Sequence, residues 1–315
     1  MPKRILFGLD DSETAYGALR KLGALLAPAD VHLHLLHAAP ETSHFHPGEL
    51  STLSGEPGPW EKTQKEQAEA ILKRADQLLQ QLGFTPARIK QELTLRCANA
   101  AQEILAAGER QAPTAIAIAR RGRSGVKRFF LGSTTTQVCQ YAEKVPVWVL
   151  GSRPLEPPHV LVALDESPYA DRLAAHVGEH FGRLSGTRVT LFHVLAAKPP
   201  GFWDDGHILG ETERAERDRT VAQWRNEQER NTADLFKQAK EKLTAAGVPE
   251  LNIAVVHRAM AAGIARDILA EAARGDYNIL VFGRRGTSAI KEFTLGSRAA
   301  KMLHSPSELT VILVG

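Results

Sequence analysis

The sequence predicts an α/β protein of two tandem domains, each a doubly wound, five-stranded parallel sheet with helices on both faces. In each half, short apolar runs rich in β-branched residues alternate with longer segments of helical periodicity. Some of these runs, such as residues 279–282, are almost entirely apolar, as expected for strands that helices cover on both sides. The alternation occurs twice in 315 residues, which suits two domains of about 150 residues each.

The strands are expected where apolar runs stand between turn signals, and the helices where apolar residues recur every three or four positions. The second half repeats the order of the first and ends with a strand at 309–314, and its charged segment 211–242 is interpreted as an amphipathic helix packed on the sheet. In the first half the expected order is strand 5–9, helix 15–26, strand 31–36, helix 62–82, strand 89–95, helix 100–107, strand 115–118, helix 134–141 and strand 145–150.

Matching positions define an internal duplication. Asp10 and Asp165, which follow the first strand of each half, are 155 residues apart, and the offset is 156 at His37 and His193. From Ile104 onward the offset is 164, so eight additional residues of the second half lie between His193 and Ile268. Insertions gather in surface connections, so that segment should be the least constrained part of each half.

The proline-rich stretch 155–158 separates the two copies, and we place the domains at 1–154 and 155–315. The net charge of +3 comes from 39 basic and 36 acidic residues spread along the chain, without the basic stripe and aromatic residues of a nucleic-acid surface. No apolar run approaches the roughly 20 residues that span a membrane, and the first residues lead directly into a strand. We therefore expect a cytoplasmic protein without nucleic-acid or membrane partners.

Two residue types invite alternative interpretations. Cys97 and Cys139 have no counterparts in the other half, which favours two unpaired buried thiols over a disulfide. His44 and His46 could supply two zinc ligands, but no further ligands follow at suitable spacing, so ordinary histidines are favoured over a metal site. The segment 201–205, with Phe and Trp, is either a surface loop or a lid or partner surface.

The strongest functional signal is a glycine pattern behind the apolar run 278–282. Gly283 and Gly286 are followed by Gly296 and Ser297 at the start of the next expected helix. Glycine lets backbone N–H groups approach an anion, and the first turn of a helix adds unpaired N–H donors. This spacing predicts a phosphate site.

The first half carries a near copy of this pattern, with Ala119 in place of the first glycine and with Gly122, Gly132 and Ser133 retained. The extra methyl of Ala119 would stand where backbone and phosphate meet, and would disfavour a positive φ at that position. Arg120, Arg121 and Arg123 would still attract phosphate, so we rank the second site above the first. In doubly wound sheets the carboxyl ends of the first and fourth strands border one crevice, so each glycine set should meet an Asp-x-Ser turn there.

These residues resemble the universal stress protein family, whose nucleotide-binding members carry the pattern Gly-x2-Gly-x9-Gly-Ser/Thr. The resemblance covers essentially the whole chain and extends to both Asp-x-Ser turns and to the His-Ala and His-Val pairs that close the second strand of each half (His37, His193). It implies a Rossmann-like, HUP-type fold. It also implies that the last strands of the two halves pair, so that the chain forms an intrachain pseudo-two-fold dimer. Homodimerisation of the whole chain and the protein partner stay open.

The resemblance implies an ATP, ADP or AMP site, with Mg²⁺ accompanying the nucleotide. It places Ala163 and Asp165 at the adenosine and ribose, the backbone of Val194 at adenine, and Phe282 and Gly283 at the ribose and phosphate. The phosphate contacts would come from Arg284, Gly286, Gly296, Ser297 and Arg298, and the first half would use Asp10, Ala38, Gly122, Gly132 and Ser133.

The residues favour a regulatory nucleotide-binding protein with little or no turnover over an enzyme. Asp165 could hold Mg²⁺ and Arg284 could clamp a phosphate, but no general base accompanies them. A slow ATPase and a nucleotide-independent scaffold that binds a partner or another ligand remain alternatives. An adenylating enzyme is disfavoured because the sequence has neither a Ser-Gly-Gly-x-Asp-Ser loop nor a His-x-Gly-His element.

Overall fold

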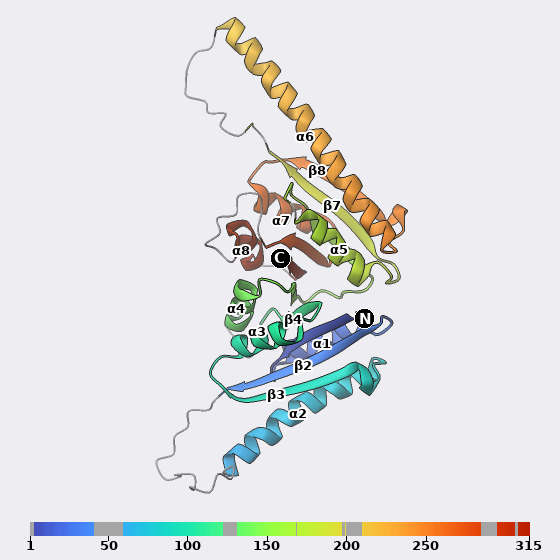
Figure 1. Ribbon diagram of the computed structural model, residues 1–315, viewed down its shortest axis with the longest axis vertical. Helices are drawn as coiled ribbons and strands as arrows, with labels where there is room; N and C mark the ends of the chain where they lie inside the picture. The colour runs from blue at the N-terminus through green and yellow to red at the C-terminus, as the bar shows by residue number, and fades with distance from the viewer. Residues whose placement is uncertain are drawn as a thin grey trace. The chain divides into compact units, whose positions relative to one another are not determined.

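The fold is described from a computed structural model, which covers residues 3–40, 59–121, 131–167, 169–196, 199, 210–284, 295–305 and 308–315. The contacts divide the chain into two compact units. The first unit contains Met1–Glu156 together with Leu303–Gly315, and the second contains Pro157–Met302 (Figure 1).

The first unit alternates strands and helices in the predicted order. Its elements are β1 (Lys3–Leu9), α1 (Glu13–Leu26), β2 (Val31–Pro40), α2 (Pro59–Gln81), β3 (Ile89–Cys97), α3 (Ala100–Gln111), β4 (Ala115–Ala119), α4 (Ser133–Tyr141), β5 (Val147–Leu150) and β10 (Thr310–Val314). The strands are ordered β3-β2-β1-β4-β5 and are mutually parallel, and β10 pairs antiparallel with β5. The predicted pairing of the two last strands is therefore confirmed, with Ile312 opposite Trp148.

The strand order of this sheet reverses between β1 and β4, which makes their carboxyl ends the natural place for a ligand. The four helices form two pairs, because α1 contacts α2 and α3 contacts α4. The side chains of β4 and β5 are buried throughout, which explains why their sequences are apolar without alternation.

The second unit repeats this arrangement with the parallel strand order β9-β6-β7-β8. Its elements are β6 (His159–Ala163), α5 (Ala170–Phe181), β7 (Arg188–Leu195), α6 (Glu211–Ala245), β8 (Ile253–Ala259), α7 (Ile264–Arg274), β9 (Ile279–Gly283) and α8 (Ser297–His304), the last of which continues into the first unit at Leu303.

The charged helix α6 packs against α5 and β7. Its 35 residues span about 52 Å, whereas the seven residues of β8 span about 23 Å, so α6 extends well beyond the strands of its unit (Figure 1). Gly178 of α5 and Gly182, the C-cap of α5, allow the close contact at the carboxyl end of α6. A Cβ on either glycine would come within 2.6 Å of Ala246.

Both cysteines are buried and form no disulfide within the described residues, as predicted. Among the described helices, none combines the length and the apolar composition required to cross a membrane.

Candidate functional site

A cavity of about 260 Å³ opens in the first unit where the strand order reverses. It lies at the carboxyl ends of β1, β2 and β4 and is closed by the first turns of α3 and α4. The lining residues include Gly8, Asp10, Leu36, Ala38, Ala100, Ile104, Ile118, Ala119, Arg121, Gly132, Ser133, Thr134 and Thr135. Of the first-half residues predicted from the sequence, Asp10, Ala38, Gly132 and Ser133 therefore meet in one cavity.

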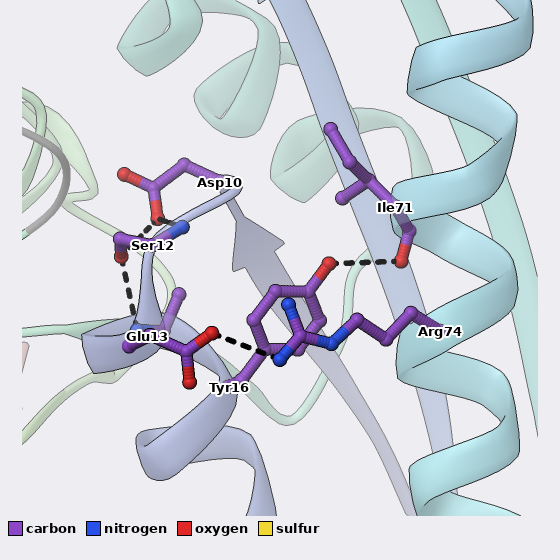
Figure 2. Close-up of polar contacts among 7 residues, drawn as sticks. Asp10, Ser12, Glu13, Tyr16, Ile71 and Arg74 are labelled. Atoms are coloured by element: carbon purple, nitrogen blue, oxygen red, sulfur yellow. Dashed lines mark hydrogen bonds and ion pairs between the residues drawn. The ribbon is translucent and has the colours of Figure 1, made fainter.

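Asp10 holds the turn between β1 and α1. Its Oδ1 accepts hydrogen bonds from the backbone N–H of Ser12 at 3.2 Å and from the Ser12 hydroxyl at 2.5 Å (Figure 2). Ser12 in turn caps α1, since its Oγ accepts from the N–H of Ala15 at 3.1 Å. The helix cap is thus Ser12, and Asp10 both orders that cap and borders the cavity.

The start of α1 is fixed against α2 by a cluster of side chains beside this turn. The Arg74 guanidinium lies 4.0 Å from the centre of the Tyr16 ring and 2.8 Å from the Glu13 carboxylate (Figure 2). The Tyr16 hydroxyl donates to the carbonyl of Ile71 at 3.3 Å. Burial is the main cause that raises the pKa of Tyr16, so the phenol stays protonated and can donate this bond at neutral pH.

His37 fixes the end of β1 from the neighbouring strand. Its Nδ1 lies 2.9 Å from the carbonyl oxygen of Leu9. A carbonyl can only accept, so Nδ1 carries the proton, and the buried ring connects β2 to the residue before Asp10. The histidine of the His-Ala pair therefore positions the turn, while its neighbour Ala38 lines the cavity.

The first turn of α4 forms the polar wall of the cavity. Gly132 is the N-cap and makes no side-chain cap, so the N–H groups of the first turn receive no capping side chain. A Cβ on Gly132 would meet protein atoms no closer than 3.6 Å, which is ordinary contact. The protein fold itself therefore tolerates a side chain here, and the absence of one leaves the cavity open beside the helix terminus.

The two arginines that follow β4 point in different directions. Arg121 lines the cavity, whereas Arg120 is only 8 % exposed and its Nη2 donates to the carbonyl oxygens of Leu303 and Ser305. Arg120 was expected to attract phosphate together with its neighbours. The structure corrects that expectation, because the Arg120 guanidinium is bound to the carbonyl groups of residues 303 and 305, and Arg121 is the one of these two arginines that lines the cavity.

The second unit repeats several bonds of this framework, but not the serine cap, since the N-cap of α5 is Tyr169, which makes no side-chain cap. Asp165 Oδ1 accepts from the backbone N–H of Ser167 at 3.2 Å and also from its hydroxyl. His193 Nδ1 lies 2.9 Å from the carbonyl oxygen of Leu164. The N–H of Gly296 donates to the carbonyl of Arg284 at 3.0 Å, as Gly132 does to Arg120 at 3.1 Å.

The register of the duplication relates the predicted second-half residues to the first cavity. Eight of them have counterparts that line it: Ala163, Asp165, Val194, Phe282, Gly283, Gly296, Ser297 and Arg298 correspond to Gly8, Asp10, Ala38, Ile118, Ala119, Gly132, Ser133 and Thr134. Arg284 corresponds instead to Arg120 and is itself only 2 % exposed. Other predicted positions lie outside the described residues: Gly122, Arg123, Gly286, His44, His46 and the segment 201–205.

Gly283 is the last residue of β9 and is not among the glycines with positive φ in the described chain, which are Gly83, Gly186, Gly247 and Gly263. The idea that Ala119 would disfavour a positive φ at this position is therefore wrong, because the position is extended in both halves. What distinguishes the two halves here is one methyl group in the wall of the crevice.

A larger cavity, of about 970 Å³, was not predicted from the sequence. It lies in the second unit between α6 and the strands β7 and β8, with Phe236, Ile253 and Val255 among its lining residues. It forms because α6 packs on α5 rather than over β8. The sequence carries no motif there that would have indicated it.

The duplicated, doubly wound parallel sheet, with a cavity at the carboxyl ends of the strands in the first unit, defines an α/β protein of the Rossmann-like class. The profile of the universal stress protein family matches the chain twice, over residues 1–151 and 158–313. The chain belongs to the universal stress protein family, with two copies of its domain in tandem.

Solved structures show the same fold. A universal stress protein from Archaeoglobus fulgidus DSM 4304 is 21 % identical over 100 % of this chain and 98 % of its own, with a TM-score of 0.65. A functionally unknown protein from Pseudomonas aeruginosa PAO1 is 15 % identical over 99 % of this chain and 92 % of its own, with a TM-score of 0.62. A universal stress protein from Archaeoglobus fulgidus in complex with dAMP covers 50 % of this chain and 98 % of its own at 19 % identity and a TM-score of 0.32. No curated protein shows a significant match to the sequence.

Proposed function

We propose that this protein is a cytoplasmic regulator that binds an adenine nucleotide, ATP, ADP or AMP, in each of two domains, 1–154 and 155–315. The single observation that carries the proposal is the first-unit cavity, which brings Asp10, Ala38, Gly132 and Ser133 together where the strand order reverses. Its volume of about 260 Å³ is slightly below the roughly 300–1,000 Å³ of small-molecule sites.

The two ends of the cavity suit the two ends of a nucleotide. The first turn of α4, with Ser133, Thr134 and the side chain of Arg121, offers donors and positive charge to phosphates. The opposite wall is apolar, with Leu36, Ala38 and other aliphatic side chains, and suits a flat base. Asp10 borders the same cavity, where a carboxylate can accept from ribose hydroxyls.

The second domain carries the complete glycine set and is proposed as the tighter site. The proposed residues are Ala163, Asp165, Val194, Phe282, Gly283, Arg284, Gly286, Gly296, Ser297 and Arg298. The 2 % exposure of Arg284 favours a structural role for it within this set, because its counterpart Arg120 holds carbonyl groups away from the first cavity.

The aspartate and serine oxygens of the two proposed sites fit a nucleotide-bound Mg²⁺, because this ion prefers carboxylate and phosphate oxygens and retains water ligands. Asp10 and Ser133 in the first site, and Asp165 and Ser297 in the second, would supply protein oxygens, and the ion would neutralise phosphate charge. Among the described lining residues of the first cavity the acidic side chain is Asp10, and its Oδ1 already accepts two bonds from Ser12. This arrangement favours holding a nucleotide over hydrolysing it, since hydrolysis needs a group that activates water.

Calorimetric titration of the full chain with Mg-ATP tests the proposal. Gly132→Val places two methyl groups in the cavity beside α4, and Gly296→Val is the matched change in the second half. We expect two ATP per chain for the wild type and one for each variant, with the weaker site missing in Gly132→Val.

Circular dichroism and thermal unfolding check that each variant is folded. At Gly132 a Cβ has a clearance of 3.6 Å, so the fold accommodates the first carbon of the new side chain. A wild-type chain that binds no ATP at millimolar concentration, or two sites that persist in both variants, would overturn the proposal.

A further inference from the structure

Arg120 connects the first cavity to helix α8. The Nη2 atom of its buried side chain donates to the carbonyl of Leu303 at 2.9 Å and to the carbonyl of Ser305 at 2.5 Å, at the carboxyl end of α8. Its own carbonyl accepts from the N–H of Gly132 at 3.1 Å. One residue therefore contacts the end of α8 with its side chain and the N-cap of α4 with its backbone.

The bonds to α8 are of a strong type. The last carbonyl groups of a helix lack partners within the helix and carry partial negative charge, so a guanidinium is well suited to them. Both bonds are charge-assisted, and the bond to Leu303 is buried while the bond to Ser305 is partly buried. Loss of the guanidinium would leave the buried carbonyl of Leu303 without this donor.

The neighbours of Arg120 are the residues that would meet a ligand. Ala119 and Arg121, on either side of it, line the first cavity, as does Gly132. The helix that it holds is short. The eight residues of α8 span about 12 Å, and its first residues, Ser297 and Arg298, belong to the proposed second site.

We propose that Arg120 is a positioning residue through which the two nucleotide sites are coupled. The inference rests on the proposed function. A ligand that draws Gly132 and the first turn of α4 toward its phosphates shifts the Arg120 carbonyl, which accepts from the N–H of Gly132, and the Arg120 side chain transmits that shift to the end of α8. Since α8 is a single short helix, its first turn moves with its last. Coupling of this kind is reciprocal, so a filled second site changes the affinity of the first by the same factor.

The test compares the first-site affinity for Mg-ATP in the full-length wild type with that in Gly296→Val, in which the second site is closed. We expect the first site to bind about fivefold more tightly when the second is filled, at the low end of known allosteric couplings. The coupling ratio is the first-site affinity with the second site filled divided by that with the second site closed. It should fall to one when the same comparison is made in Arg120→Met. Arg120→Lys keeps a cation and a donor, so it should give an intermediate ratio.

Arg121→Met is the matched control. It removes a neighbouring guanidinium that faces the cavity, so it should weaken the first site directly while the coupling ratio stays near five. An equal ratio in the wild type and in Arg120→Met would overturn the inference, as would loss of coupling in Arg121→Met alone.

Hydrogen exchange without ligand separates this inference from the proposed function. We expect the amides of α8 to exchange about tenfold faster in Arg120→Met than in the wild type, while Arg121→Met leaves them unchanged. If the wild type binds no ATP, the proposed function fails, and faster exchange in α8 still supports the positioning role of Arg120. Unchanged exchange in α8 would refute that role whatever the protein binds.

Discussion

Several polar side chains in this protein hold the ends of secondary-structure elements beside the cavities. His37 and His193 each donate to the carbonyl before the aspartate of their turn, and Asp10 orders the serine that caps α1. These bonds fix the backbone before any ligand arrives. Preorganisation of this kind lowers the entropic cost of binding, because the turn is not ordered again by the ligand.

His34 is a buried residue whose titration should affect stability. It is 6 % exposed and its Nε2 lies 3.0 Å from a Glu92 oxygen. Lys90 and Glu92 on β3 and Arg110 and Gln111 on α3 face it, and Gln111 and Arg110 also bond to Glu92. Burial is the largest effect and lowers the pKa of His34, with Lys90 adding to it and Glu92 opposing it, so the ring is neutral at pH 7.

The lowered pKa predicts a loss of stability in mild acid. The unfolded chain takes up a proton near pH 6.5 while the folded chain does not, so the stabilisation is complete above that pH. It falls by about 1.4 kcal/mol for each pH unit between the unfolded and the folded pKa. Urea unfolding of the wild type and of His34→Gln between pH 8 and pH 5 measures the effect. The difference in unfolding free energy between the two proteins at pH 8 gives the cost of the substitution that does not depend on ionisation. If the unfolding free energies of both proteins fall in parallel below pH 6.5, the effect does not come from His34.

The sequence predicted the residues that form the turns better than it predicted the directions of side chains. Asp10, Gly132 and Ser133 were placed correctly in one cavity because a strand-turn-helix pattern fixes where the backbone goes. Arg120 and Arg121 are indistinguishable in sequence. Which of them lines the cavity depends on the path of the backbone after β4, and what Arg120 contacts depends on residues 183 and 185 positions further along the chain.

At the scale of elements, the end of β5 depends on a glycine. The N–H of Gly151 donates to the hydroxyl of Thr310 at 3.1 Å, and a Cβ on Gly151 would overlap the carbonyl oxygens of Glu308 and Leu309. These atoms are backbone and cannot rotate away. The close approach places β10 against β5 in the antiparallel pairing that ends the sheet of the first unit.

Gly151→Ala should therefore destabilise the protein by about 1–3 kcal/mol, the usual effect of overpacking. Gly17→Ala is the matched control, because Gly17 lies within α1 and a Cβ there has no protein atom within 4 Å. It should stabilise the protein by about 0.5–1 kcal/mol, since alanine is the better helix former. Chemical denaturation of both variants measures the two effects. An unchanged free energy of unfolding in Gly151→Ala would show that the 308–310 backbone is not held in this contact.

The order of the elements could be predicted from the sequence, but the surface against which each helix packs could not. Apolar periodicity located α6 to within a few residues, since the helix runs to Ala245 rather than to residue 242. Its contact with α5 depends on Gly178 and on the C-cap residues Gly182 and Ala246, small residues whose importance appears only when the two helices are placed together. The cavity beside β8 follows from the same packing.

The molecule as a whole is a duplication in which the framework is conserved more closely than the ligand-facing residues. The turn bonds, the histidine bonds and the glycine N–H bonds have nearly the same lengths in both halves. The crevice positions differ, with Gly8 against Ala163 and Ala119 against Gly283. The bonds that shape the backbone are therefore shared by both halves, whereas the crevice positions are not.

Exchanging the first residue of the glycine pattern between the halves tests whether one methyl group ranks the two sites. Because the backbone is extended at Gly283 and at Ala119, neither Gly283→Ala nor Ala119→Gly introduces a strained φ. If the glycine serves close approach of a phosphate, Gly283→Ala should weaken the second site about tenfold, or about 1.4 kcal/mol, and Ala119→Gly should strengthen the first.

Calorimetry with Mg-ATP measures each site separately when the other site is closed. Gly283→Ala is therefore combined with Gly132→Val, and Ala119→Gly is combined with Gly296→Val. The doubly swapped chain should bind more tightly in its first half, with the total of two ATP unchanged. Thermal unfolding gives the stability cost of removing the buried Ala119 methyl, so that a loss of binding from partial unfolding is recognised. Unchanged affinities in both swaps would show that the ranking of the sites comes from other residues of the crevice, the arginine and threonine at positions 298 and 134 first among them.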